Sequence, residues 1–341
     1  MAPYNNPIHI QPTLMKNTPS LPILLLLLLS LLVSHPSHAT PASTRAQREA
    51  AVNKAIDWLH NQLLMGEIDG MSTCDAARVI ALAGENPDAA RWTLNGNSLL
   101  TRCENAFQNL VRKDAGEGAK ALRAALAAGR DPRHFAGTDL IAFIEGEYDP
   151  SVGFYHDYNL FRNNLAIIAL SEAGRPIPPQ AVAALAAEQN QDGCWGWPIG
   201  GDVTDTDTSG LTLHALAAAG RADHPAISQC VARLRAMQND DGGWELSGIY
   251  GDKVSNVNST ALVVQGLVAV GWDPEGLAFT RDQTAIQALL SFQADDGAFW
   301  WRHDQPGALL LGTIQAIQPL LMTYPNEIPK PIRLHHPLVI R

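Results

Sequence analysis

Apolar residues recur at every third or fourth position through most of the chain after residue 44, in segments that Gly and Pro interrupt. This spacing places apolar side chains on one face of a helix and predicts six pairs of α-helices. Ala and Leu dominate these segments and strands are poorly signalled, so we expect an all-α protein. The predicted pairs are 45–64 and 72–83, 98–111 and 118–128, 138–145 and 159–173, 179–189 and 207–219, 225–238 and 259–270, and 281–293 and 307–322.

The two helices of a pair differ in polarity. Second helices such as 211–219 and 261–270 are apolar nearly all round, which is typical of helices inside a fold. First helices carry more charge, for example Arg233, Arg235 and Asp282, and should lie outside. Several second helices end at a Gly that suits a left-handed C-terminal cap. Six outer–inner hairpins predict an (α/α)6 toroid with parallel inner helices.

A short pattern of Gln, Asp-Gly and an aromatic residue occurs three times, at 189–195, 238–244 and 293–300. Its glycines, at 193, 242 and 297, are 49 and 55 residues apart, which is enough for two helices and their loops. The Asp can cap a helix end, the Gly can form the turn, and the aromatic ring can pack on the outer wall. We interpret these residues as braces that lie outside any active site.

This pattern resembles the QW repeat of terpenoid cyclases and the related repeat of protein prenyltransferase β subunits. That superfamily, which includes squalene–hopene cyclase-like repeats and bacterial transcobalamin-like barrels, folds as an α/α toroid. The resemblance covers roughly residues 45–323 and is strongest in the last three hairpins. In the first three, residues 149–154 are a degenerate copy. The resemblance implies a toroid for residues 40–324.

The N-terminal segment has the features of a signal peptide. Residues 21–33 are almost entirely Leu, a run too short to span a bilayer but suited to a signal sequence. Ser37 and Ala39 supply small residues for cleavage after position 39. Met15-Lys16 offers an alternative start, and an uncleaved membrane anchor is the competing interpretation. We expect a secreted protein, extracellular or periplasmic, without an anchor after cleavage, whose residues 325–341 form a tail.

The net charge disfavours two classes of partner. Residues 1–39 hold one Lys and no acidic residue, so the remaining chain has 23 basic and 34 acidic residues and a net charge of −11. An acidic protein of this kind is not expected to bind nucleic acid or anionic membrane surfaces.

The four cysteines, Cys74, Cys103, Cys194 and Cys230, allow two disulfides in a secreted protein, with three possible pairings. Neither a CxxC motif nor Cys/His ligand spacing occurs, so we predict no metal site and no cofactor.

Loops rich in aromatic and polar residues should meet at the rim formed by the N-termini of the inner helices. This rim gathers positive helix-dipole ends and free N–H groups, and a concave apolar pocket beside it would be the default ligand site. His214 follows Asp207 by seven residues, so both share a helix face. The candidate ligand-binding residues are Tyr155, Tyr158, Asp202, His214, Tyr250, Trp300, Trp301 and His303.

An acidic stretch, residues 202–209, opens the predicted fourth inner helix. It resembles the DxDD motif of squalene–hopene-type cyclases, in which the middle Asp protonates a polyene. Asp205 and Asp207 match the first two acids, and Thr208 stands where the third belongs. The resemblance implies that Asp207 is a catalytic general acid and Asp205 its partner. Clustered carboxylates raise one another's pKa, whereas a helix N-terminus lowers it. The alternative is that this stretch simply caps the helix.

The functional motifs of other families with this fold are not matched in this sequence. Residues 252–259 contain no Cys, which prenyltransferases need for zinc, and the thioester segment of complement proteins is absent. Residues 258–267 look like inner helices of cobalamin carriers, but the β domain that clamps the corrinoid is missing. We expect a toroid that binds an apolar or amphipathic small molecule, isoprenoid or corrinoid, in its cavity. The alternative is a class II terpene cyclase-like enzyme, an isomerase that uses Asp207. A protein-interaction toroid and a sugar-active enzyme remain open.

Overall fold

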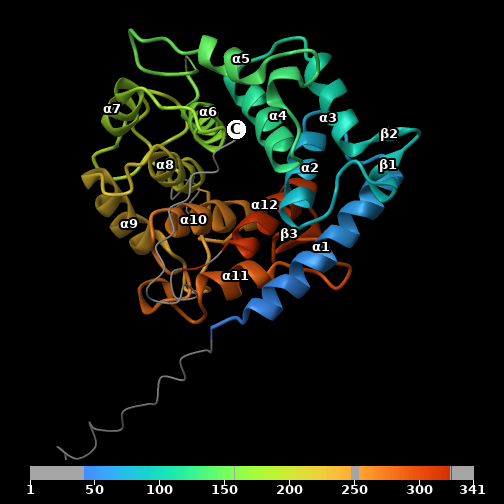
Figure 1. Cartoon of the computed structure of the whole chain (residues 1–341). Helices are drawn as coiled ribbons and strands as arrows, with labels where there is room; N and C mark the ends of the chain where they lie inside the picture. Colours follow the sequence, from blue (N-terminus) through green and yellow to red (C-terminus); the bar gives the residue numbers. More distant parts are fainter. Residues whose placement is uncertain (1–41, 157, 247–252, 323, 325–341) are drawn as a thin grey trace, which may run out of the picture. The chain divides into compact units, whose positions relative to one another are not determined.

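Twelve α-helices alternate between outer and inner positions in the part of the chain that the structure describes (Figure 1). The structure is a computed structural model and describes residues 42–156, 158–246, 253–322 and 324, all within the compact unit Thr40–Arg341. The outer helices are α1 (Arg45–Met65), α3 (Leu99–Gln108), α5 (Leu140–Gly146), α7 (Pro179–Ala187), α9 (Pro225–Met237) and α11 (Ala285–Ser291). The inner helices are α2 (Ser72–Leu82), α4 (Ala115–Ala127), α6 (Leu160–Glu172), α8 (Thr206–Ala218), α10 (Val257–Ala269) and α12 (Leu310–Leu321).

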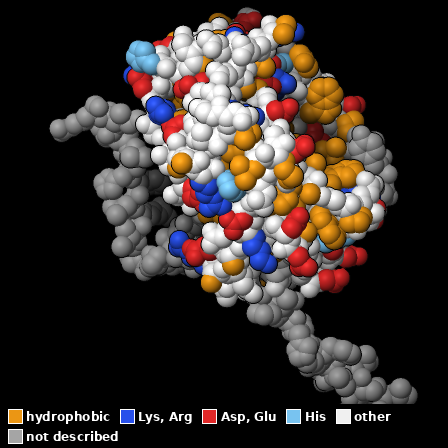
Figure 2. All heavy atoms as spheres, turned by 90° about the vertical axis from the view of Figure 1, so that its right-hand side faces the viewer, with side chains coloured by type: hydrophobic (Ala, Val, Ile, Leu, Met, Phe, Trp, Pro, Cys, Tyr) orange, Lys and Arg blue, Asp and Glu red, His pale blue; other side chains and the backbone are white. Residues whose placement is uncertain are grey.

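The inner helices form a closed ring. Each packs against the next, and α12 packs back against α2. Helix α10 shows why they occupy this position, because its residues from 259 to 267 are all buried. The face in Figure 2 carries acidic and basic side chains, with hydrophobic side chains gathered on part of it. The all-α (α/α)6 toroid predicted from the sequence is therefore confirmed.

Short 3₁₀ turns and two pairs of short strands lie in the connections between the helices. The 3₁₀ turns are η1 (Ala90–Trp92), η2 (Pro132–His134) and η3 (Leu277–Phe279). Strands β1 (Thr93–Leu94) and β2 (Asn97–Ser98) form one antiparallel pair, and β3 (Trp300–Arg302) and β4 (Gln305–Ala308) form another. The periodicity did not reveal β4, whose residues 307 and 308 were predicted to start the last inner helix.

Side-chain caps fix where four inner helices begin. At each, an Asp or Asn side chain accepts a hydrogen bond from the backbone N–H three residues later, which satisfies a donor that the helix leaves unpaired. The capping residues are Asp114 for α4, Asn159 for α6, Asp205 for α8 and Asn256 for α10. The caps hold the N-termini of these helices at the rim where the sequence placed the candidate site.

The three Gln–Asp–Gly copies brace the outer wall. In each, the Gln amide donates to the carbonyl of the glycine four residues on and to the backbone of the next outer segment. The second acceptors are Ala226 for Gln189, Phe279 for Gln238 and Ala51 for Gln293, at 2.7, 2.8 and 2.8 Å. The last of these bonds joins the sixth hairpin to α1 and closes the outer ring.

The Trp and Asp residues of the copies also form hydrogen bonds with the backbone near the turn. The indole N–H groups of Trp195 and Trp244 each donate to a carbonyl of the preceding outer helix at 2.8 Å. Asp192 and Asp241 accept from the N–H two residues later, so they close the loop instead of capping a helix.

Two disulfides tie outer helices to their neighbours. Cys74 in α2 pairs with Cys103 in α3, and Cys194 in the first Gln–Asp–Gly copy pairs with Cys230 in α9. The structure thus selects one of the three pairings that the sequence left open. The predicted signal peptide, Met15 and the tail 325–341 lie outside the described residues. Every described helix is too short or too polar to cross a bilayer.

Candidate functional site

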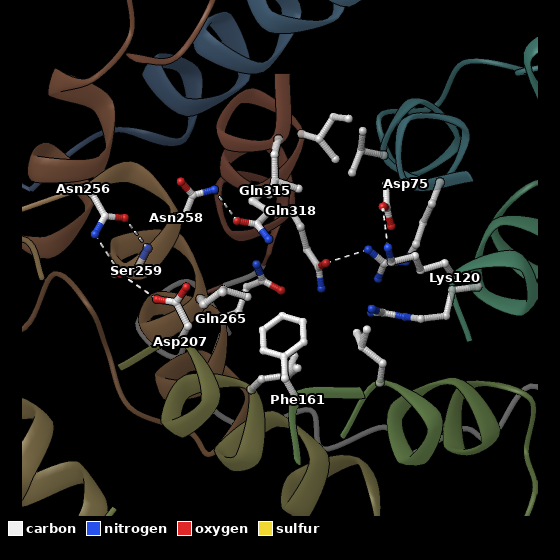
Figure 3. A pocket seen from close by; sticks show the side chains of 18 of the residues that line it. Asp75, Lys120, Phe161, Asp207, Asn256, Asn258, Ser259, Gln265, Gln315 and Gln318 are labelled. Atoms are coloured by element: carbon white, nitrogen blue, oxygen red, sulfur yellow. Dashed lines mark hydrogen bonds and ion pairs between the residues drawn. The ribbon is translucent and has the colours of Figure 1, made fainter. Parts of the chain in front are cut away.

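The inner helices surround a cavity with two adjoining compartments. The narrower compartment has a volume of about 360 Å³, and the wider compartment has a volume of about 580 Å³. Both are bordered by Lys120, Phe161, Leu165, Asp207 and Leu246, so they meet at these side chains. Volumes of this size are typical of small-molecule pockets. Figure 3 shows Asp207 and Ser259 on one side of the narrower compartment and Asp75 and Lys120 on the opposite side.

Helical spacing determines which side chains reach this cavity. Asp207 and Leu211 from α8 and Asn258, Leu262 and Gln265 from α10 all line the narrower compartment, at steps of three or four residues. Leu211 and Leu262 are the aliphatic residues among them. Asp207, Asn258 and Gln265 are polar, so several polar groups converge on this compartment, as in a ligand site.

Asp207 lies in the first turn of α8 and borders both compartments. Its Oδ1 accepts a hydrogen bond of 2.6 Å from Ser259 Oγ on α10. Asn256 donates in turn to Ser259 Oγ at 2.9 Å. Burial raises the pKa of the Asp207 carboxyl to about 7, against the lowering effect of the Ser259 hydrogen bond and with a contribution from the nearby charge of Asp205. At neutral pH this carboxyl is therefore protonated in a large fraction of molecules.

Two glycines explain how Ser259 comes so close to Asp207. A Cβ on Gly210 would lie 2.4 Å from the Leu262 carbonyl oxygen, and one on Gly266 would lie 2.3 Å from the Gly210 carbonyl oxygen. Only glycine at these positions allows α8 and α10 to pack this tightly.

Asp205 has a different role from Asp207. It is the N-cap of α8, is 6% exposed, and accepts a 2.6 Å hydrogen bond from the Thr208 N–H. Burial raises its pKa, and backbone hydrogen bonds to its carboxylate oppose that shift. The capping interpretation therefore describes Asp205, whereas Asp207 faces the cavity, although both also border the wider compartment together with Asp202.

The aromatic candidates divide between the cavity and other places. Trp301 lines the narrower compartment. Tyr155 is buried against Tyr148, Tyr158 is exposed, and His303 stacks on Phe292, so the structure does not place these three on either compartment. Trp300, in β3, does not line them either, and Tyr250 lies outside the described residues.

His214 lies deeper in the ring, near Glu172, Arg123 and Arg78. Burial and the positive charge of Arg123 lower its pKa to about 3, so the ring is neutral at physiological pH. Its Nδ1 is buried and has no hydrogen-bond partner among the described residues.

Sequence reasoning missed a group of basic residues in the cavity wall. Arg78 of α2 and Lys120 and Arg123 of α4 all line the narrower compartment. Arg and Lys inside otherwise apolar inner helices were the available signal. Within the described ranges, His, Cys, Asp and Glu side chains do not form a group of three that could hold a metal ion.

Comparisons with known proteins identify relatives of this fold. Residues 179–289, which include Asp205, Asp207 and Ser259, match the family described as squalene-hopene cyclase N-terminal domain. No curated protein is significantly similar in sequence.

Several solved structures are similar in fold. The type II terpene cyclase MstE from Scytonema is 16% identical with a TM-score of 0.56, over 81% of this chain and 98% of that one. An MstE variant was solved with its substrate, geranylgeranyl dihydroxybenzoate, and gives 16% and 0.54 over 81% and 97%. A possible GH105 family member from Salmonella enterica serovar Paratyphi A is 11% identical with a TM-score of 0.57, over 85% and 96%. At these identities the likeness shows the fold alone.

Proposed function

The chain has the α/α-toroid fold of the terpenoid cyclase and protein prenyltransferase superfamily, and we propose that it is a class II terpene cyclase-like enzyme. In this proposal the cavity binds a polyprene, and protonated Asp207 starts its cyclisation. The observation that carries the proposal is the Asp207 carboxyl group, which has a pKa of about 7 and lies where the two compartments meet, beside Phe161, Leu165 and Leu246.

The proposed step is a proton transfer to a carbon–carbon double bond. The Asp207 O–H bond breaks, the π electrons form a C–H bond, and the other alkene carbon becomes a cation. A following double bond then attacks that cation and closes a ring. The final cation loses a proton to water, and the Asp207 carboxylate takes up a proton from solvent, so the overall reaction is an isomerisation. A general acid works best when its pKa lies near the working pH, which supports Asp207 in this role.

The surroundings of Asp207 support such a reaction. Phe161 and Trp301 border the narrower compartment, and aromatic faces attract cations. With a polyprene bound, aliphatic neighbours such as Leu211 and Leu262 would pack against it and keep water from a cation. MstE shares the fold and holds a geranylgeranyl substrate, which supports an isoprenoid as the ligand.

Binding without turnover is the second candidate. It is favoured by Thr208, which stands in place of a third acid, and by Asp205, whose carboxylate is engaged in capping α8. A carrier of this kind would hold an isoprenoid, or a corrinoid, in the same cavity. In either case we propose a secreted protein, a location that the two disulfides support.

The test uses residues 40–341 and a panel of squalene, geranylgeraniol and a corrinoid. Native mass spectrometry reports binding, and gas chromatography–mass spectrometry reports products. We expect a cyclised product with the wild type and none with Asp207→Asn, which should still bind the polyprene. Asp295→Asn changes an exposed carboxylate in the third Gln–Asp–Gly copy and should retain turnover. Retained binding without any product in the wild type would favour the carrier, and product formation by Asp207→Asn would refute the acid role.

A further inference from the structure

Three basic side chains line the side of the cavity opposite Asp207. Arg78 and Arg123 are 8% and 7% exposed, and Lys120 lies beside them (Figure 3 shows Lys120). Burying two guanidinium groups costs free energy unless acceptors satisfy them. Arg78, Lys120 and Arg123 are called the basic layer below.

The acceptors that the chain supplies to the basic layer are few. Arg123 donates to both carboxylate oxygens of Glu172, at 3.0 and 2.9 Å, and Arg78 shares the same carboxylate at 3.4 Å. Arg78 also donates to Gln318 Oε1 at 2.6 Å. One carboxylate therefore serves two guanidinium groups, each of which has five N–H donors.

Lys120 is less satisfied than the arginines. Its Nζ lies 3.8 Å from Asp75 and 3.4 Å from Glu117, and it donates no hydrogen bond to the described residues. Burial raises the pKa of Asp75, and the positive charge of Lys120 opposes that shift. Glu117 is itself paired with Arg162 at 3.2 Å. The ammonium group thus has donors available toward the cavity.

Gln265 adds a neutral hydrogen-bond donor to the cavity wall. Its side chain is 5% exposed and lines the narrower compartment, yet its amide makes no hydrogen bond with the described residues. In Figure 3 it lies between Asp207 and Gln318. The Gln265 amide is therefore free to donate a hydrogen bond to a polar group in the cavity.

We propose that the basic layer binds the oxyanion headgroup, a carboxylate or phosphate, of an amphipathic isoprenoid. Lys120, Arg78 and Arg123 supply the positive charge, and the Gln265 amide donates an additional hydrogen bond. An oxyanion accepts hydrogen bonds and donates none, so it matches a wall with surplus donors. This inference rests on the proposed function and makes its substrate class specific: an anionic polyprenoid in place of a bare hydrocarbon such as squalene.

The placement leaves room for the isoprenoid chain. Asp207 and His214, which is close to Arg123, are separated by seven residues of α8, or about 10 Å along the helix axis. Leu211 and Leu262 line the cavity between these levels. A ligand held by its headgroup at the basic layer would therefore pass apolar wall before it reaches the Asp207 carboxyl.

The test compares two ligands that differ only at the headgroup, geranylgeranoic acid and geranylgeraniol, with inorganic phosphate as a competitor. We expect the wild type to bind the acid at least about tenfold more tightly than the alcohol, as for loss of one charged hydrogen bond. Lys120→Met should abolish that preference without changing affinity for the alcohol, and Lys120→Arg should restore it. Lys54→Met, on the exposed face of α1, should behave as the wild type.

Each result bears on the proposal. Equal affinity for acid and alcohol, or a preference that survives Lys120→Met, would overturn it. If inorganic phosphate competes at the same concentration as the acid, the isoprenoid chain contributes no affinity. That result would overturn the assignment of an amphipathic ligand. Asp207-dependent cyclisation of the alcohol without a preference for the acid would refute only the headgroup inference. If neither geranylgeranoic acid nor geranylgeraniol binds, and squalene from the first panel does not bind either, the proposed function is refuted as well.

Discussion

Replacing Asp207 with Asn should stabilise the protein at neutral pH and leave it unchanged in acid. Folding raises the pKa of this carboxyl from 3.8 to about 7, so the folded state favours its protonated form. Below pH 3.8 the carboxyl is protonated in both states, and Asp and the neutral Asn are equivalent. Between pH 3.8 and 7 the unfolded chain ionises first, which progressively destabilises the wild type. Above pH 7 the difference is constant.

The size of the effect follows from the shift. About three pKa units at 1.36 kcal/mol each correspond to an upper limit of about 4 kcal/mol. Because the Asp207 carboxyl borders a cavity that water can enter, we expect roughly half of this, about 2 kcal/mol. For a domain of this size that stabilisation raises the melting temperature by about 4 °C.

Thermal unfolding from pH 4 to pH 9 tests this reasoning. The melting temperature of Asp207→Asn should separate from that of the wild type between pH 4 and 7 and then stay parallel to it. The exposed substitution Asp295→Asn should show no such separation. Two results would mean that burial does not destabilise the ionised carboxyl. In the first, the difference in melting temperature between the variant and the wild type is the same at every pH. In the second, that difference favours the variant less at pH 8 than at pH 4.

Three further predictions concern the bracing and the site. Gln238→Ala removes two buried hydrogen bonds between outer segments and should lower the free energy of unfolding by about 2 kcal/mol in urea titration. Gly297→Ala should cost at least about 2 kcal/mol, since φ is +96° and the new Cβ would lie 2.2 Å from a backbone carbonyl of α1. Ser259→Ala removes the hydrogen bond that lowers the Asp207 pKa, so the alkaline limb of the pH–rate profile should move to higher pH.

Matched variants control these measurements. Gln191→Ala is the control for Gln238→Ala, because it removes an exposed amide and should leave the free energy of unfolding unchanged. Gly66→Ala is the control for Gly297→Ala, because it introduces a Cβ at a similar positive φ but into open space. If Gly66→Ala costs as much as Gly297→Ala, backbone strain alone explains the loss and the close contact with α1 does not contribute. An unchanged or lowered alkaline limb for Ser259→Ala would contradict the assignment of Asp207 as the titrating acid.

The sequence by itself determined the architecture, because that information is local and repeated. The apolar spacing identified the helices, and the all-round apolar segments identified the inner ones, since only buried helices can be apolar on every side. The Gln–Asp–Gly copies indicated the hairpin period, and their hydrogen bonds stay within a copy or reach the next outer segment. Each of these features depends on residues close in sequence or on a regular repeat.

Only the tertiary structure decided what the acidic stretch does. Asp205 and Asp207 are two residues apart, so their side chains leave α8 in different directions, and one caps the helix while the other meets Ser259. Ser259 is 52 residues further along the chain, and its approach depends on the close packing of α8 and α10 at Gly210. The positions of the loop residues Tyr155 and His303 likewise depended on loop conformations that periodicity does not encode.

The basic layer is the clearest case of a feature that only the tertiary structure decided. In sequence its residues are charges within two Ala-rich helices, about 40 residues apart, and nothing there indicates that the two helices share them. They form one group because α2 and α4 lie side by side in the ring and face Glu172 of α6. The sequence determined that the chain closes into a toroid, whereas the ring determined which charges meet inside it, because a cavity is made by contacts between helices that are distant in the chain.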